Sequence, residues 1–445
     1  MAVTPLSVYE PGRTDFISKL PVEILITILS FLGMEEAIRT SVLSRRWRDM
    51  WTYTRRLSFD DAQLVYDRFP TERVEAKFVH WVNHILESHQ GTNIDEFEVC
   101  FNVNEGDSKS DIDGWIAFSL RKRVKRLYVD FTTFHKISQQ GKYKLTTEFL
   151  SIYNLDSLTV LYLNSVEVTG KVVEYILSHC PFLEVLNVTD SNSLLHLKVL
   201  GSSLKLKSLE ILDCNLLKDI KIAAKHLVSF EYSGPIISIS LINTPSLTEI
   251  RVGAMFFVKN IYQLSGCLSQ LEVLELDFLT VKDIKIFRTL IRLPVLRNLK
   301  QLELRLNRLS NIFYCISLLK VFPQLRTLIV EMSRSNSSAI DESEKIKYKF
   351  GKMEEHEEKQ HKCLKVIEVS GYKGVEGVDA MLLLWLLRRA GSYDDLVIAV
   401  EEEESKDAFA IFAKSVLALK VKKIGPKAEL VFSTLSNLKE LSSIS

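Results

Sequence analysis

A short pattern of apolar residues recurs along most of this 445-residue chain and limits what the chain can fold into. The pattern is apolar-x-x-apolar-x-apolar, as in Leu158, Leu161 and Leu163, and ten clear copies occur between residues 124 and 369. Repetition of this kind predicts a solenoid, because the apolar side of each short strand is buried only when the next copy stacks on it. Eight copies follow one another at intervals of 20 to 28 residues, and their middle residues are Leu161, Leu186, Leu209, Phe230, Ile250, Leu274, Leu302 and Leu328.

These intervals are typical of leucine-rich repeats, which are roughly 20 to 29 residues long. Helical spacing occurs in residues 76–87, 170–178 and 282–293, so we expect helices there. The shorter units around Tyr232 and Val252 should return through a turn or an irregular segment. The predicted fold class is therefore α/β, an irregular leucine-rich-repeat solenoid whose parallel strands form a β-sheet horseshoe behind an N-terminal group of three helices.

The stretch from Asp15 to Trp51 precedes the repeats and carries more apolar surface than so short a segment can bury. Pro21 is a favourable first helical residue. A segment of fewer than roughly 40 residues rarely folds without a metal, disulfides or a partner, and this one contains neither Cys nor His. We therefore expect another protein to cover it. One apolar helical face is expected from Ile24, Leu25, Ile28, Leu29 and Leu32. Gly33 should end this helix, and a third helix is expected after Ser44.

The same stretch resembles the F-box, a family with a Leu-Pro pair, an apolar helix and a closing Val-Leu-Ser-Lys/Arg-Arg-Trp-Arg segment. This chain has Leu20-Pro21 and a closing segment from Val42 to Arg48, in the form typical of the large plant branch, but Gly33-Met34 replaces the usual Pro-Thr. The resemblance implies docking on a Skp-type adaptor and, through it, on a cullin. Trp47 is either an adaptor contact or part of the F-box core, and the alternative for the whole stretch is a helical cap on the next domain. The adaptor-binding residues implied by the resemblance are Leu20, Pro21, Ile24, Ile28, Leu32, Val42 and Trp47.

Two segments follow the regular repeats. Residues 333–361 are polar and charged, and they form either a regulatory, partner-contacting loop or a tolerated surface insertion. Residues 363–390 and the Pro-Lys-Ala-Glu-Leu-Val-Phe-Ser segment that ends at Ser433 resemble the FBD domain of plant F-box proteins, which we expect to cover the last strand edge. The predicted domains are a flexible N-terminus (1–14), the F-box (15–55), the repeats (56–332), the insertion (333–361), the FBD domain (362–435) and a tail (436–445).

The inner face of the predicted sheet carries the informative polar residues, because residues that alternate with the apolar positions point away from the core. Neighbouring strands lie about 4.8 Å apart, so adjacent glutamates repel one another and Arg251 relieves part of that repulsion. We expect this acidic face to bind a target that presents basic or hydrogen-bond-donating groups. The alternative is that glutamate is only a common solvent-facing residue. The central residues of successive units are Tyr128, Tyr162, Glu210, Glu231, Arg251, Glu275 and Glu303.

Charge and motifs exclude several function classes. Fifty-seven basic and 56 acidic residues give a net charge of +1, which argues against nucleic acid and membranes as partners. The six cysteines form no CxxC pair, and the chain lacks GxSxG, P-loop and HExxH motifs. His80 and His84 stand at metal-binding spacing without a third ligand. We therefore expect no catalytic residue, metal or resident cofactor; the sequence does not indicate whether a small molecule assists target binding.

These observations favour a non-catalytic substrate receptor of a Skp-cullin-F-box ubiquitin ligase, whose repeats bind a protein target; the alternative is a leucine-rich-repeat scaffold outside any ligase. A rigid link would raise the effective concentration of target lysines near the ubiquitin-conjugating enzyme. The N-terminus lacks a secretory signal, and the longest apolar run, 380–387, is too short to span a bilayer. We expect a nuclear or cytoplasmic protein that is not secreted. Residues 121–126 are either a nuclear localisation signal or ordinary solvated charge.

Overall fold

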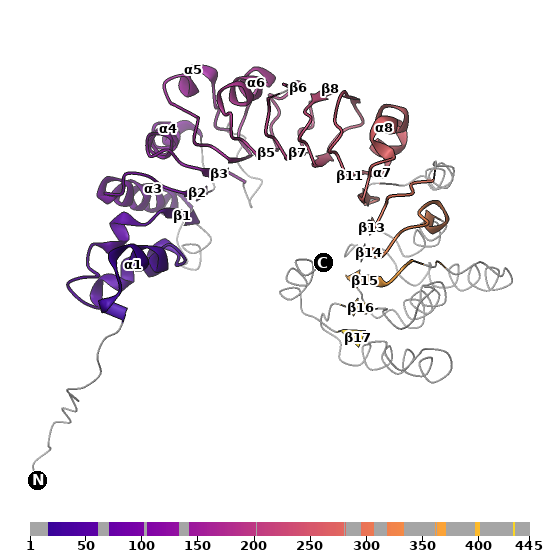
Figure 1. The fold of residues 1–445 in the computed structure, drawn as a ribbon. Helices are drawn as coiled ribbons and strands as arrows, with labels where there is room; N and C mark the ends of the chain where they lie inside the picture. Colours follow the sequence, from indigo (N-terminus) through magenta and orange to yellow (C-terminus); the bar gives the residue numbers. More distant parts are fainter. Residues whose placement is uncertain are drawn as a thin grey trace, which may run out of the picture. The chain divides into compact units, whose positions relative to one another are not determined.

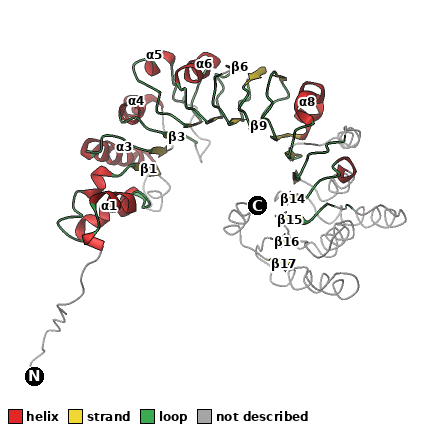
Figure 2. Ribbon diagram, in the orientation of Figure 1, coloured by secondary structure: helices red, strands yellow, loops and turns green. Residues whose placement is uncertain are grey.

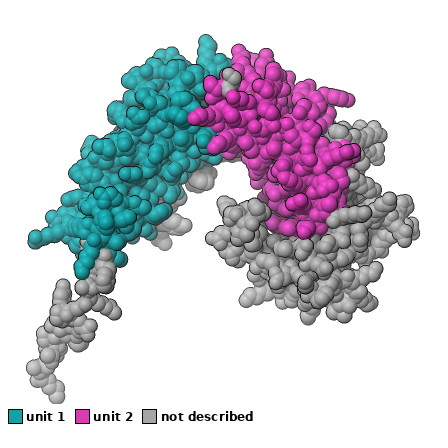
Figure 3. Space-filling view, in the orientation of Figure 1, with its two compact units in different colours: residues 1–193 teal, residues 194–445 magenta. Residues whose placement is uncertain are grey.

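The computed structural model divides into two compact units, residues 1–193 and residues 194–445, and each is described by itself (Figure 3). Four predicted segments lie wholly or almost wholly outside the described residues: the N-terminus 1–14, the helix 282–293, the charged insertion 333–361 and the tail 436–445. The structure describes residues 17–60, 71–101, 105–132, 142–201, 203–279, 281, 295–306, 318–332, 361, 363–370, 397–400 and 430–431.

Unit 1 begins with a group of short helices, as the F-box resemblance predicts (Figures 1 and 2). Pro21 immediately precedes the first α-helix. Buried Leu25, Leu29, Ala37 and Trp47 form the core of the group. The helices are η1 (Ile17–Lys19), α1 (Val22–Leu29), α2 (Met34–Arg39), η2 (Thr40–Val42) and η3 (Met50–Tyr53).

The end of this helical group differs from the prediction. The third helix, expected after Ser44, is replaced by tight turns, because the amides of Trp47 and Met50 bond to carbonyl groups three residues earlier, at 3.1 and 3.2 Å. Such bonds are those of a 3-10 helix, which is stable only in short pieces. Helix α1 also ends at Leu29 rather than at Gly33. Gly33 instead precedes α2, and its amide donates to the Glu36 carboxylate at 3.3 Å.

The repeats of unit 1 form a parallel ladder with helices on one side (Figure 1). The predicted apolar positions pair in register, with Leu127 opposite Leu161 and Leu161 opposite Leu186. The helices predicted within residues 76–87 and 170–178 are confirmed by α3 and α6. The strands are β1 (Arg56–Asp60), β2 (Glu96–Cys100), β3 (Arg126–Asp130), β4 (Val160–Asn164) and β5 (Val185–Thr189), and the helices between them are α3 (Thr71–Ser88), α4 (Glu105–Arg121), α5 (Thr147–Leu150) and α6 (Gly170–His179).

Unit 2 also carries the repeat pattern as a parallel ladder of strands. The predicted strands are confirmed, and three strands in the FBD-like segment extend the same ladder, while the boundary between repeats and FBD domain stays a prediction. The strands are β7 (Ser208–Leu212), β9 (Ser229–Ser233), β11 (Glu249–Gly253), β12 (Val273–Asp277), β13 (Gln301–Leu306), β14 (Thr327–Met332), β15 (Val366–Ser370), β16 (Val397–Val400) and β17 (Leu430–Val431).

The return segments of unit 2 include a second sheet that the sequence analysis missed. Its strands are β6 (His196–Leu200), β8 (Asp219–Ala223) and β10 (Ser238–Leu241), all parallel. The predicted irregular returns are therefore wrong: the 21-residue step that leads to β9 and the 20-residue step that leads to β11 pass through β8 and β10. About 20 residues leave little room for a helix, and the apolar residues of these segments alternate with period two. Figure 1 draws β6 and β8 on the side of unit 2 where α7 (Ala254–Lys259) and α8 (Ile261–Leu268) lie, opposite β7 and β11.

Left-handed residues mark the exits from several strands. Ser165, Asp190 and Asp213 follow β4, β5 and β7 directly, and their φ angles are 54°, 55° and 54°. Asp tolerates this conformation better than most residues, since its side chain bonds locally. In unit 1 the Ser165 hydroxyl also donates to the Asp190 carboxylate at 2.7 Å, which ties two successive turns together. A recurring backbone bend thus ends the strand in the same way in each of these repeats.

Candidate functional site

The F-box divides its apolar residues between a core and an exposed surface. Leu25 and Leu29 point into the core, whereas Ile24 and Ile28 on the same helix α1 are exposed. Among the residues that the F-box resemblance implies as adaptor contacts, Pro21, Ile24, Ile28, Leu32 and Val42 are exposed, and Val42 has 85% of its surface accessible. The single apolar face expected from helical spacing is therefore split, with one part available to another protein.

Leu20 and Trp47 lie differently from the other five. Leu20 is half-buried against the core cluster, and its carbonyl oxygen accepts a hydrogen bond from Arg46 at 2.6 Å. Trp47 is only 4% exposed and belongs to that core, which is the second of the two roles that the sequence left open. In this structure Trp47 supports the surface rather than forming it.

Between residues 17 and 43, four further exposed apolar residues are not among the adaptor contacts that the resemblance implies: Ile17, Val22, Phe31 and Leu43. The available signal was sequence position, since Val22 and Phe31 fall off the apolar helical face predicted from Ile24 to Leu32. Exposed apolar groups concentrated in one small region are a mark of protein interaction sites. Together with the five exposed contacts, these residues define what we call the F-box outer surface.

Backbone bonds join the F-box to the repeats within unit 1. The amides of Gln90 and Gly91 donate to the carbonyl oxygen of Thr52, at 2.8 and 3.3 Å. The Nε2 atom of the buried His89 lies 2.9 Å from the carbonyl oxygen of Thr54. Burial lowers the pKa of His89, and nearby Lys122 lowers it further. The F-box is thus held by specific bonds to the loop that precedes β2.

The inner face of unit 1 carries a pair of stacked tyrosines. Tyr128 on β3 and Tyr162 on β4 are in register, their ring centroids lie 5.1 Å apart and their planes differ by 27°. Glu98 and Asn187 flank the pair in the same row. Both rings are half-buried, and burial raises the pKa of Tyr128. The predicted aromatic residues therefore form a platform, and Asn187, which the sequence analysis omitted, lies beside it.

The inner face of unit 2 carries the predicted acidic row in continuous register. Cα partners confirm that Glu210 lies opposite Glu231, Glu231 opposite Arg251, Arg251 opposite Glu275, and Glu275 opposite Glu303. The side-by-side arrangement expected from the repeat spacing is therefore present from β7 to β13.

Two arginines bridge this row. Glu275 contacts Arg251 at 3.2 Å and Arg305 at 3.3 Å, and Arg305 also contacts Glu331 at 2.8 Å. Arg251 pairs in addition with Glu249. The two guanidinium groups thus join strands β11 to β14 across the inner face.

Burial disfavours the ionised form of the glutamates in this row. Glu275 is 7% exposed, and burial together with the charge of Glu303 raises its pKa to about 7 despite its two arginines. Burial also raises the pKa values of Glu231 and Glu303. Carboxylates with little access to water are stabilised by additional hydrogen-bond donors or cations. The row can therefore accept hydrogen bonds from a partner that brings such groups.

Two family models match this chain. The F-box domain model matches residues 17–59. The model described as At1g61320/AtMIF1, LRR domain, matches residues 85–407, which is well over half of the chain. The chain belongs to the plant F-box/leucine-rich-repeat family. In this F-box/leucine-rich-repeat protein the repeat match runs through both the charged insertion and part of the predicted FBD domain.

Relatives in Arabidopsis thaliana carry the same combination of names. F-box/FBD/LRR-repeat protein At1g13570 is 27% identical over 257 residues, which cover 54% of this chain and 53% of the relative. F-box/LRR-repeat protein At2g42730 is 30% identical over 259 residues, with 54% and 56% covered. Putative F-box/LRR-repeat protein At3g42770 is 26% identical over 337 residues, with 70% and 63% covered. The match spans about half the length of the first relatives.

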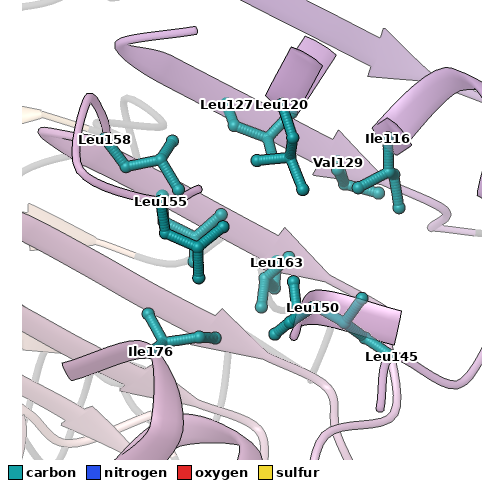
Figure 4. Close-up of a pocket in the computed structure, with 11 residues that line it drawn as sticks. Ile116, Leu120, Leu127, Val129, Leu145, Leu150, Leu155, Leu158, Leu163 and Ile176 are labelled. Carbon is teal, nitrogen blue, oxygen red and sulfur yellow. The ribbon is translucent and has the colours of Figure 1, made fainter. Parts of the chain in front are cut away.

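An apolar gap inside unit 1 of this F-box/leucine-rich-repeat protein is a packing feature and not a ligand site (Figure 4). Its lining is entirely apolar and comes from β3, β4 and the helices beside them, including Ile116, Leu120, Leu150 and Leu163. It offers about 10 Å³ to the centre of a water-sized sphere, which is near the minimum for one water molecule, and it lacks the polar groups that a water needs.

The basic cluster of residues 121–126 is mostly engaged within the protein. Arg123 contacts Asp156 at 3.1 Å, Lys125 contacts Asp95 at 2.7 Å, and Arg126 contacts Glu96 at 2.8 Å. The Lys122 ammonium donates to the carbonyl oxygen of Gly91 at 2.5 Å. Four of its five cations thus have internal partners, which favours structural charge over a freely presented localisation signal.

Within the residues that the structure describes, no group of three or more His, Cys, Asp or Glu side chains is arranged to hold a metal ion. None of the helices in the same residues combines the length and apolar character needed to cross a bilayer.

Proposed function

We propose that this F-box/leucine-rich-repeat protein is the substrate-recognition subunit of a Skp-cullin-F-box ubiquitin ligase. The observation that carries the proposal is the F-box outer surface: Ile24, Ile28 and Val42 are exposed although the core of the same helices is already closed. A Skp-type adaptor, with the cullin behind it, is the partner that the F-box match suggests for this surface.

In this proposal the chain holds a target in position near the ligase, which requires no catalytic residue in the chain itself. The bonds from Gln90, Gly91 and His89 to the end of the F-box support a stiff link between the adaptor-bound end and the first repeats. A stiff link keeps a bound target at a defined distance from the ubiquitin-conjugating enzyme, so target lysines experience a high effective concentration. We place this activity in the nucleus or the cytoplasm.

Each unit offers its own candidate surface for a target, on the inner side of its strands. Unit 2 offers the half-buried or buried carboxylates of Glu231, Glu275 and Glu303, and unit 1 offers the tyrosine platform of Tyr128 and Tyr162. A protein segment with Lys or Arg side chains fits either surface, because carboxylates form charge-assisted bonds with cations and tyrosine rings attract them.

Affinity purification of the full chain tests both surfaces. The double charge reversal Glu231→Lys and Glu275→Lys should abolish target capture while adaptor capture remains. The matched control is Glu148→Lys with Glu174→Lys, which reverses two exposed glutamates outside the acidic row. Retention of targets by the inner-face variant would contradict the proposed site. Absence of the adaptor from every preparation would instead favour a scaffold outside any ligase.

A further inference from the structure

The second sheet of unit 2 presents a face that the proposed function does not use. Residues of β6, β8 and β10 alternate between the core and the exterior. Leu197, Val199, Ile220, Ile222 and Ile239 are buried on the inward side. The outward residues stand in three rows: His196, Asp219 and Ser238; Lys198, Lys221 and Ser240; Leu200, Ala223 and Ile242.

The middle row brings two like charges together. Lys198 on β6 lies directly opposite Lys221 on β8, and both are exposed. Neighbouring strands are about 4.8 Å apart, and like charges at opposed positions destabilise the pairing. The acidic residue of this face is Asp219, and its carboxylate lies 2.5 Å from the Nδ1 atom of His196 in the first row. The lysine pair is therefore positive without a carboxylate placed between its members.

Exposed apolar groups flank the lysine pair on both sides. Leu200 and Ile242 in the third row are 53% and 57% exposed. At the other end, Leu195, Leu216 and Ile236 are exposed in the turns that precede the strands. Five of the nine large exposed hydrophobic residues among the described part of unit 2 thus surround one small sheet.

Charge is also divided between the two sides of this part of the unit. Glu210 and Glu231 lie on the inner ladder, whereas Lys198 and Lys221 lie on the outer sheet, with exposed Lys218 and Lys225 close to β8 in sequence. An anionic partner is therefore repelled by the inner face and attracted by the outer one.

We propose that the outer face of β6, β8 and β10 is a second docking surface, which binds an acidic protein segment whose aliphatic side chains cover Leu200 and Ile242. The lysine pair favours acidic groups, and the exposed apolar side chains on both sides of it disfavour partners that are polar throughout. A nucleic acid would leave these apolar side chains exposed to water, so the observations favour a peptide. This surface is independent of the adaptor and of the target row.

A random 12-residue peptide display library, selected on the full chain, tests this docking surface. Peptides that combine Asp or Glu with Leu, Ile or Phe should be enriched. A representative peptide should bind about tenfold more weakly to the Lys198→Glu, Lys221→Glu variant, since two charge-assisted contacts are reversed. Leu200→Ser with Ile242→Ser should weaken the same peptide, and Lys109→Glu with Lys171→Glu, on exposed helical positions of unit 1, should not.

Other outcomes overturn the proposal. They are no enrichment of acidic aliphatic peptides, equal binding by the lysine variant and its control, or lysine-dependent binding seen only with a DNA duplex or with vesicles that contain phosphatidylserine. Circular dichroism melts of each variant identify any loss of folding, and in that case the serine variant alone decides the result.

Discussion

The Nε2 atom of His89 lies 2.9 Å from the carbonyl oxygen of Thr54, the residue that closes the last helical turn of the F-box. The imidazole is buried, its edge faces the Phe118 ring at a centroid distance of 5.7 Å, and its Nδ1 atom has no partner among the described residues. Because a carbonyl only accepts, Nε2 carries the proton of a neutral ring. This contact connects the F-box with the repeats.

Acid should loosen this connection. Burial and Lys122 hold the pKa of His89 below its usual value near 6.5. The stability that the neutral ring contributes is therefore present above about pH 6.5 and is lost as the pH falls through the lowered pKa. The protection factors of the Gln90 and Gly91 amides against hydrogen exchange, which correct for the slower intrinsic exchange in acid, should fall between pH 7 and pH 5. His89→Gln keeps a donor but does not titrate, so its protection factors should not show this fall; identical profiles would refute this role.

The acidic row should respond to pH in the opposite direction. The pKa of Glu275 is raised to about 7, with Glu303 and Asp277 opposing its charge and Arg251 and Arg305 favouring it. Its stabilising contribution is full below about pH 4.5 and is lost as the pH rises through 7. The melting temperature of wild type relative to Glu275→Gln should therefore fall from pH 5 to pH 8. Glu174→Gln, at an exposed position, should show a constant difference, and a constant difference for Glu275→Gln as well would contradict the raised pKa.

Asn243 tests the cost of the left-handed turn that follows β10. Its φ is 53°, and its side chain is exposed. Asn243→Gly should be neutral or slightly stabilising, because glycine adopts this conformation without strain. Asn243→Val should cost about 1 to 2 kcal/mol, the penalty of a Cβ-branched residue in the left-handed region. Equal unfolding midpoints in urea for the two variants would show that the turn relaxes.

Trp47 should act through stability. Trp47→Ala removes a core side chain and should cost about 3 to 5 kcal/mol in the F-box, with loss of adaptor binding as a consequence of unfolding. Phe31 is the matched control, since it is 80% exposed in the same region. Phe31→Ala should change the free energy of unfolding by less than about 0.5 kcal/mol. Equal melting temperatures for the two variants would contradict a core role for Trp47.

The strands of the repeats were predictable because the burial of their apolar residues determines where each strand lies. Leu161, Leu186 and their equivalents must be buried, and alternation then decides which residues lie on the inner face. That is why the row from Glu210 to Glu303 could be written down from spacing alone and appears in register. The arginine bridges were only partly predictable, since side-chain length allows Arg305 to reach Glu275 on the neighbouring strand.

The buried face of α1, the second sheet and the role of His89 depend on tertiary packing, which residue spacing does not reveal. Ile24 and Leu25 are equally apolar, yet only the packing of α2 and Trp47 decides that Leu25 is buried. The second sheet formed by β6, β8 and β10 was missed because its strands lie between the copies of the repeat motif, so the spacing that located the main ladder does not mark them. His89 gave no signal, since its role depends on a carbonyl 35 residues earlier in the chain.

The central claim is that the F-box outer surface binds a Skp-type adaptor, and the affinity of the purified full chain for that adaptor tests it most directly. The variant carries Ile24→Glu and Ile28→Glu, and its control carries the single change Ile152→Glu, at an exposed apolar residue outside the F-box. The account predicts that the variant binds at least about tenfold more weakly, with an unchanged melting temperature, because two buried interface contacts are replaced by charges. The control should bind like wild type. Wild-type affinity in a folded Ile24→Glu, Ile28→Glu variant would contradict the account.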